Sequence, residues 1–120
     1  PNYHLLITNL RTFEPSTFNL IVNTTPLGMT PNIDQSALPE NLSLPSNAFV
    51  YDLVYNPHET KLVRDARSQG IQATTGLGML IEQASLSFEI WTGCNPPRDI
   101  LRASVSYLQS PILHSSDPRA

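Results

Sequence analysis

Residues 18–29 read Phe-Asn-Leu-Ile-Val-Asn-Thr-Thr-Pro-Leu-Gly-Met, so a largely apolar run passes directly into two hydroxyls, a proline and a glycine. This order is typical of a buried strand that ends at an open sheet edge, because proline and glycine favour turns. In open parallel sheets, ligands bind at the edge formed by the carboxyl ends of the strands. We interpret residues 23–29 as the floor of a ligand crevice, although by themselves they also fit a plain strand terminator.

Residues 48–55 form a second β-favouring run, which predicts a strand covered on both faces of a parallel sheet. A helix is then predicted to begin, because Asn56 is a good N-cap, Pro57 suits the first helical position and Glu59 can complete a capping box. His58 would be the second helical residue. The strand would thus end close to a helix N-terminus.

Apolar residues at helical spacing continue this pattern to Gly70, which is predicted to end the helix as a left-handed cap. The apolar positions are Leu62, Val63 and Ala66, and the polar face carries Lys61, Arg64, Asp65 and Arg67. Residues 71–75 predict another short strand. Residues 48–75 should therefore form one right-handed βαβ unit, which makes the fold class α/β.

Two further helices are predicted at residues 77–91 and 98–108. Leu77, Leu80, Ile81, Ala84, Phe88 and Trp91 share one face of the first, and Ile100, Leu101, Val105 and Leu108 form a stripe on the second. Residues 30–47 are rich in Pro, Asn and Ser and predict a loop packed by Leu38, Leu42 and Leu44.

The two ends of the chain give weaker patterns. Residues 3–8 predict a strand, Arg11 is interpreted as an exposed loop residue, and residues 110–120 predict a flexible tail. Because the first strand begins almost at residue 1, we expect a piece of a longer protein.

The 120-residue composition, with 40% hydrophobic residues and a formal net charge of -3, is typical of one soluble globular domain. It offers no basic patch for nucleic acid and no apolar run near the roughly 20 residues that span a bilayer. His4, His58 and His114 are too scattered for a metal site. The single cysteine, Cys94, has no paired base, so it is interpreted as a small, partly buried residue in a reducing, cytoplasmic protein.

Four blocks follow one another at characteristic spacing. They are residues 23–29; residues 52–57, Asp-Leu-Val-Tyr-Asn-Pro, with Thr60; residues 76–80, Gly-Leu-Gly-Met-Leu, with Gln83 and Ala84; and residues 87–89, Ser-Phe-Glu, with Trp91, Thr92 and Gly93. Together they closely resemble the C-terminal half of the shikimate dehydrogenase family over roughly residues 18–109.

The resemblance implies an NADP-dependent hydride transfer between 3-dehydroshikimate and shikimate, on a partial Rossmann-like parallel sheet with flanking helices and C-terminal helices. It implies that residues 1–93 are part of the NADP-binding domain and that residues 94–109 return to a substrate domain. Matched to the family's motifs, the residues near the cofactor are Asn23, Thr24, Thr25, Leu53, Gly76 and Met79. The substrate contacts are Tyr55 and Gln83.

The chemistry of these residues fits those roles. Leu53 and Tyr55 would point to the same side at a strand end, because side chains alternate along a strand. Gly76 would let a ligand approach a helix N-terminus, and Met79 and Gln83 lie four residues apart on one helix. Each residue also has a structural interpretation: a half-buried strand aromatic for Tyr55, core filler for Met79 and a solvated helix residue for Gln83.

Several parts of the family's pattern are missing from the chain. These are the Gly-rich turn for the pyrophosphate, the Asn-Arg-Thr turn, and the domain that carries the catalytic lysine and aspartate. Lys61 is the only lysine and falls on a helix's polar face, so no catalytic residue is predicted. We expect the chain alone to be inactive and to associate as a homodimer through its exposed half-domain surfaces. The alternatives are a quinate-type relative or a binding module without catalysis.

Overall fold

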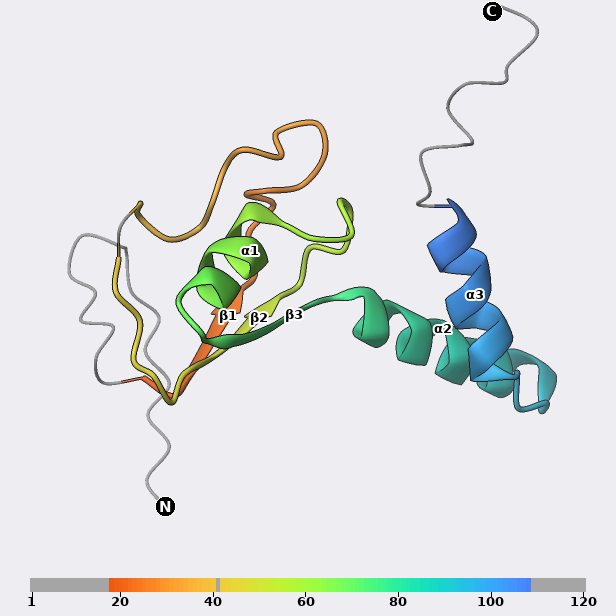
Figure 1. The fold of residues 1–120 in the computed structure, drawn as a ribbon. Coiled ribbons are helices and arrows are strands. Elements are labelled where there is room, and N and C mark those ends of the chain that lie inside the picture. The colour runs from red at the N-terminus through yellow and green to blue at the C-terminus, as the bar shows by residue number, and fades with distance from the viewer. Residues whose placement is uncertain (1–17, 41, 109–120) are drawn as a thin grey trace, which may run out of the picture.

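A computed structural model describes residues 18–40 and 42–108 and shows an α/β arrangement (Figure 1). The elements in chain order are β1 (Leu20–Asn23), β2 (Phe49–Asp52), α1 (Lys61–Ser68), β3 (Gln72–Thr75), α2 (Leu77–Thr92) and α3 (Arg98–Leu108). The predicted strand at residues 3–8, Arg11 and the tail at 110–120 lie outside the described residues. The predicted α/β class is confirmed.

The three strands form one parallel sheet in the order β1-β2-β3. Ile21 pairs with Val50, and Val50 pairs with Ala73, so these residues share one face of the sheet. The core lies between this face, α1 and the loop at 30–47, where Leu44, Ala48, Val50, Leu62, Ala66 and Ile71 are buried together. The parallel β2–α1–β3 unit predicted from the sequence is present, with α1 packed on the sheet.

The opposite face of the sheet is open among the described residues. Leu20 is 59% exposed and Val22 is 43% exposed, while Phe49 and Tyr51 are half-buried. The strand predicted at residues 48–55 is present but shorter than predicted, and its cover on the second face stays a prediction. β2 spans four residues, and the described part of the chain packs against only one of its faces.

Helix α1 begins later than its sequence predicts. Thr60 is the N-cap, since its hydroxyl accepts a hydrogen bond from the Val63 amide at 3.3 Å. Asn56, Pro57 and His58 precede the helix, so the predicted cap, first helical position and second helical residue were wrong. The Thr60 hydroxyl also donates to the buried Asp52 carboxylate at 2.6 Å, and this tertiary hydrogen bond outweighs the local Asn-Pro signal.

The end of α1 agrees with its prediction. Gly70 has a φ of +76°, the left-handed conformation that favours glycine, and its amide donates to the Arg67 carbonyl at 2.9 Å. Glu59, expected to close a capping box, instead forms an ion pair with Arg67 at 2.7 Å.

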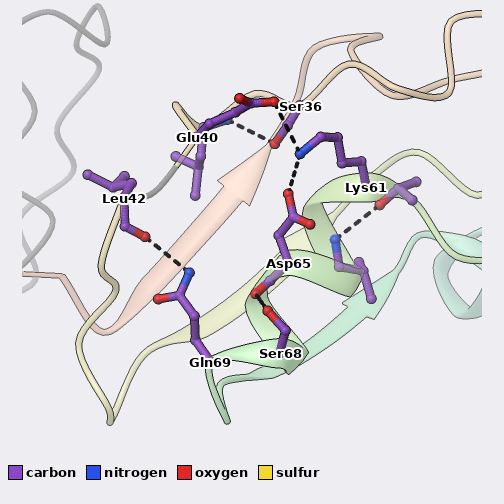
Figure 2. A network of polar contacts seen from close by, with 10 residues as sticks. Ser36, Glu40, Leu42, Lys61, Asp65, Ser68 and Gln69 are labelled. Atoms are coloured by element: carbon purple, nitrogen blue, oxygen red, sulfur yellow. Dashed lines mark hydrogen bonds and ion pairs between the residues drawn. The ribbon is translucent and has the colours of Figure 1, made fainter.

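The loop at residues 30–47 runs along α1 and is attached to it by side chains (Figure 2). The Gln69 amide donates to the Leu42 carbonyl at 3.1 Å and accepts from the Leu44 amide at 3.0 Å. Lys61 bonds Asp65 at 2.7 Å and lies 3.8 Å from Glu40. As predicted, this segment is a loop packed by Leu38, Leu42 and Leu44.

Helix α2 leaves the sheet after β3, and α3 lies against it (Figure 1). Leu77, Ile81 and Ser85 are buried, whereas no residue from Leu86 to Thr92 is. Phe88 is 44% exposed and Trp91 is 81% exposed, so the apolar face predicted for this helix is covered only near its start. The predicted helix itself is present and ends at Gly93, where φ is +69°.

Helix α3 spans the predicted residues, and its apolar stripe is also only partly covered. Ile100 is exposed, and Leu101 and Val105 are half-buried. Cys94, in the connection between α2 and α3, is exposed, so its predicted partial burial was wrong. None of the helices in the described part of the chain is long and apolar enough to cross a membrane.

Candidate functional site

All three strands end in the same row of the sheet. Asn23 pairs with Asp52, and Asp52 pairs with Thr75. The segments that follow the strands therefore start side by side at one edge, and two backbone bonds join them: the Leu53 amide to the Asn23 carbonyl at 3.0 Å, and the Gly76 amide to the Val54 carbonyl at 3.2 Å. The predicted cofactor residues Thr24, Leu53 and Gly76 each come directly after this row.

The loop after β1 is shaped by its own polar groups. The Thr25 amide and hydroxyl both donate to the Asn23 side-chain oxygen, at 3.0 and 2.7 Å, and the Leu27 amide donates to the Thr25 hydroxyl at 3.3 Å. Gly28 has a φ of +87°, and an added Cβ would lie 3.0 Å from the Gln35 carbonyl oxygen. The backbone is thus held in one turn, while the side chains of Thr24 and Thr25 reach solvent.

Asn23 itself is buried, with 3% of its surface exposed. Its amide nitrogen donates to Asp52 at 2.9 Å and to the Leu27 carbonyl at 3.3 Å. Because its amide group is engaged on both sides by the protein, Asn23 supports the loop, while Thr24 and Thr25 are exposed and a ligand can reach them.

Gly76 lies between β3 and α2, where it is the N-cap of the helix. A Cβ at this position would be 2.3 Å from the carbonyl oxygen of Leu53. Glycine is therefore required at position 76, because the backbone there lies close to the backbone of Leu53. The sequence pattern did not predict this contact. The cap carries no side-chain hydrogen bond, so the first amides of α2 point outward without a capping side chain.

The other predicted site residues differ in their exposure. Tyr55 is 39% exposed and Met79 is 41% exposed, Gln83 is exposed, and Leu53 is half-buried. β2 ends at Asp52, so Leu53 and Tyr55 lie beyond the strand, although Val54 between them is buried and the alternation continues. Met79 and Gln83 lie one turn apart in α2, which leaves this same edge (Figure 1).

Two residues of the edge were not predicted as functional, Asp52 and Thr60. Both are completely buried, and the Thr60 hydroxyl donates to the Asp52 carboxylate at 2.6 Å. The signal available in the sequence was a carboxylate inside an otherwise apolar strand, since a buried charge requires hydrogen-bond partners.

The described residues of this edge offer little for acid–base or metal chemistry. They include no cluster of His, Cys, Asp and Glu that could hold a metal ion. Hydrogen bonding to Asp65 raises the pKa of Lys61, which lies on α1 and keeps its charge at neutral pH. A hollow of about 530 Å³ lies between α1 and residues 36–44, and none of the predicted site residues lines it.

Comparison with known proteins places this edge in a family context. Residues 76–105 match the family described as "Shikimate 5'-dehydrogenase C-terminal domain". The NADP(+)-dependent shikimate dehydrogenase of Methanococcus aeolicus is 41% identical over 93 residues, which is 78% of this chain and 34% of that enzyme.

Solved structures agree with this similarity. The shikimate 5-dehydrogenase of Thermus thermophilus, in complex with NADP(H) and shikimate, has a TM-score of 0.69 and 33% identity over 78% of this chain and 35% of that one. Quinate dehydrogenase from Corynebacterium glutamicum, in complex with NAD, has a TM-score of 0.68 and 31% identity over 77% of this chain and 32% of that one.

The parallel sheet and the polar row at its carboxyl edge define part of a Rossmann-like α/β protein. The chain spans about a third of the length of the curated relatives that it matches. Within that third it is related to the shikimate dehydrogenases, and the resemblance predicted from its motifs is confirmed.

Proposed function

We propose that this chain provides the nucleotide-facing wall of an NADP-dependent shikimate dehydrogenase, which interconverts 3-dehydroshikimate and shikimate. The observation that carries the proposal is the common strand end, Asn23, Asp52 and Thr75 in one row, with the predicted cofactor residues directly after it. In this assignment residues 1–93 belong to the nucleotide domain, residues 94–109 return toward a substrate domain, and residues 110–120 are a tail.

The edge fits a dinucleotide by its chemistry. Thr24 and Thr25 are exposed, Met79 presents exposed apolar surface, and the first amides of α2 attract an electronegative group. When bound, NADP(H) supplies or accepts the hydride. Asn23 holds the threonine loop, Leu53 and Gly76 hold the neighbouring loop, and Tyr55 and Gln83 offer a hydroxyl and an amide to a polyol acid.

None of these residues can transfer the substrate's hydroxyl proton at neutral pH as a lysine or carboxylate base would. We therefore expect the purified 120-residue chain to show no shikimate oxidation in an NADP-linked absorbance assay. Formation of NADPH above the blank would show that the chain contains a catalytic group at another position.

Binding tests the proposal separately from catalysis. In amide NMR spectra of the labelled chain, NADP+ should shift the signals of Thr24, Thr25, Gly76 and Met79. The amide of Arg64, on the exposed polar side of α1, is the internal control and should not move. Shifts that spare the edge would contradict the assignment.

The second ligand separates the related candidates. With NADP+ present, shikimate should shift the amides of Tyr55 and Gln83, and quinate in a parallel titration would identify a quinate-type relative. Repeating both with NAD+ tests the choice of nucleotide. A non-catalytic module that binds neither acid would leave these two amides unchanged.

We also propose that the isolated chain associates with a second copy. Leu20 and Val22 leave apolar surface on the open sheet face, and Ile90 and Trp91 are 80% and 81% exposed on α2. Exposed apolar surface of this kind favours association in water.

A further inference from the structure

Asp52 is a completely buried carboxylate whose role the proposed chemistry does not explain. It lies at the last position of β2, on the face of the sheet that packs against α1, and no part of it reaches solvent. The hydrogen bonds that it accepts come from neutral groups. A buried carboxyl group needs hydrogen-bond partners, so its contacts identify what it holds in place.

The two carboxylate oxygens join three segments of the chain. Oδ1 accepts from the Asn23 amide at 2.9 Å and from the Val54 backbone amide at 3.0 Å, and Oδ2 accepts from the Thr60 hydroxyl at 2.6 Å. One side chain thus connects the end of β1, the segment that leads to Tyr55, and the N-cap of α1.

The side-chain oxygens of Asp52 act as acceptors in all three hydrogen bonds, so each neighbour must turn a donor toward them. The Asn23 amide must turn its nitrogen toward Asp52, which turns its oxygen toward the amide and hydroxyl of Thr25. Thr60 must donate its proton to Asp52, which leaves a lone pair for the Val63 amide. The hydrogen-bond directions of the threonine loop and of the α1 cap both follow from this one side chain.

We propose that Asp52 is the positioning residue of the nucleotide-facing edge: through Asn23 it orients the loop that presents Thr24 and Thr25, and through the Val54 amide it orients Leu53 and Tyr55. It touches no ligand, since it is buried. The role of Asp52 in nucleotide binding rests on the proposed function. Its effect on the orientation of the two loops can be measured without any ligand.

The first experiment uses the unmodified chain. Amide hydrogen exchange should show that the Thr25 and Val54 amides open together, with the same dependence on denaturant, because both depend on the same carboxylate. The Leu42 amide, bonded to the Pro39 carbonyl at 3.4 Å, is a local control that should exchange independently. Independent opening of Thr25 and Val54 would overturn the inference.

The second experiment removes one of the two acceptors. Asp52→Asn keeps the shape but replaces one oxygen with an NH2 donor, which must face either the Thr60 hydroxyl or the Asn23 and Val54 amides. Exchange at Thr25 should become at least about tenfold faster, and NADP+ should bind about tenfold more weakly, as expected for losing one oriented contact. Values within twofold of the unmodified chain would overturn the proposal.

Two variants separate positioning from general loss of stability. Asn23→Asp combined with Asp52→Asn restores a donor and acceptor across the pair, and should recover part of the protection at Thr25. Val50→Ala opens the core beneath β2 without touching the network, and should lower the unfolding midpoint while NADP+ affinity stays within twofold. If Val50→Ala weakens binding as much as Asp52→Asn does, the role is structural only and the proposal fails.

The two proposals fail in distinguishable ways. If the unmodified chain binds no NADP+ but Thr25 and Val54 still open together and respond to Asp52→Asn, the proposed function fails and the positioning of this edge stands. If NADP+ binds and Asp52→Asn changes neither exchange nor affinity, the function stands and the positioning role fails.

Discussion

At the scale of single residues, Gly76 shows how a short motif can have more than one cause. A helix-initiating glycine in a cofactor site suggests room for a ligand, yet the position of its missing Cβ is already occupied by the Leu53 carbonyl oxygen. Gly78, two residues later, has no described atom of another segment within 4 Å of its own Cβ position. The two glycines therefore form a natural pair for comparison.

Gly76→Ala should lower the free energy of unfolding by about 1–3 kcal/mol, because the loop at Leu53 must move to admit the methyl group. Gly78→Ala should be neutral or stabilising by up to about 1 kcal/mol, since alanine favours the helix. Urea denaturation followed by circular dichroism measures both. Equal destabilisation by the two substitutions would indicate a helix effect and would contradict the packing explanation.

At the scale of elements, the described residues of the connection between β1 and β2 form no helix and nevertheless pack against α1. The Gln69 side chain satisfies backbone groups of this loop, because its amide group hydrogen-bonds the backbone of residues 42 and 44 (Figure 2). Leu44 can then be buried in the core as part of a loop.

Gln69→Ala should destabilise the fold by about 1–2 kcal/mol, because the Leu44 amide loses its partner and two hydrogen bonds disappear. Gln69→Glu keeps the acceptor for the Leu44 amide but turns a carboxylate oxygen toward the Leu42 carbonyl, so it should also destabilise the fold. Gln72→Ala, at an exposed position of β3, is the matched control and should stay within about 0.5 kcal/mol. Thermal and urea unfolding measure the stability of each variant. If Gln72→Ala destabilised the fold as much as Gln69→Ala, the two Gln69 hydrogen bonds would not explain the loss.

At the scale of the whole molecule, the sheet and the α2–α3 pair both carry uncovered apolar surface. The open sheet face presents Leu20 and Val22, and α2 presents Ile90 and Trp91. Surfaces of this kind are normally covered in a folded protein, by its own chain or by a partner.

Light scattering should show the chain as a dimer at tens of micromolar. Leu20→Lys or Trp91→Lys should shift it toward monomer, whereas Ile33→Lys, at a 45% exposed loop position, should not. Trp91 is the single tryptophan, so its emission should move to shorter wavelength as the concentration rises if α2 is buried. A monomer at every concentration would exclude self-association.

Prediction from the sequence succeeded where the signal was local. The apolar run at Leu20–Asn23, the helical spacing of Leu62 and Ala66, and the glycine at 70 were enough to place a strand, a helix and its end. It failed at the start of α1, where Asn56 and Pro57 have the local pattern of a helix N-terminus. Thr60 is the N-cap instead, because its hydroxyl forms a buried hydrogen bond with Asp52. It also failed to show that the apolar face of α2 is covered only near its start, because periodicity identifies an apolar helix face but not the segment that packs against it.

The sequence by itself determined the α/β order, the parallel pairing of its strands and the relation to the shikimate dehydrogenases, since periodicity, turn residues and motif spacing are properties of neighbouring residues. Only the tertiary structure decided that Asp52 bonds Asn23 across 29 positions of the chain, and that Gly76 is needed for contact with Leu53. These contacts depend on how segments distant in sequence approach one another, which a linear pattern does not contain.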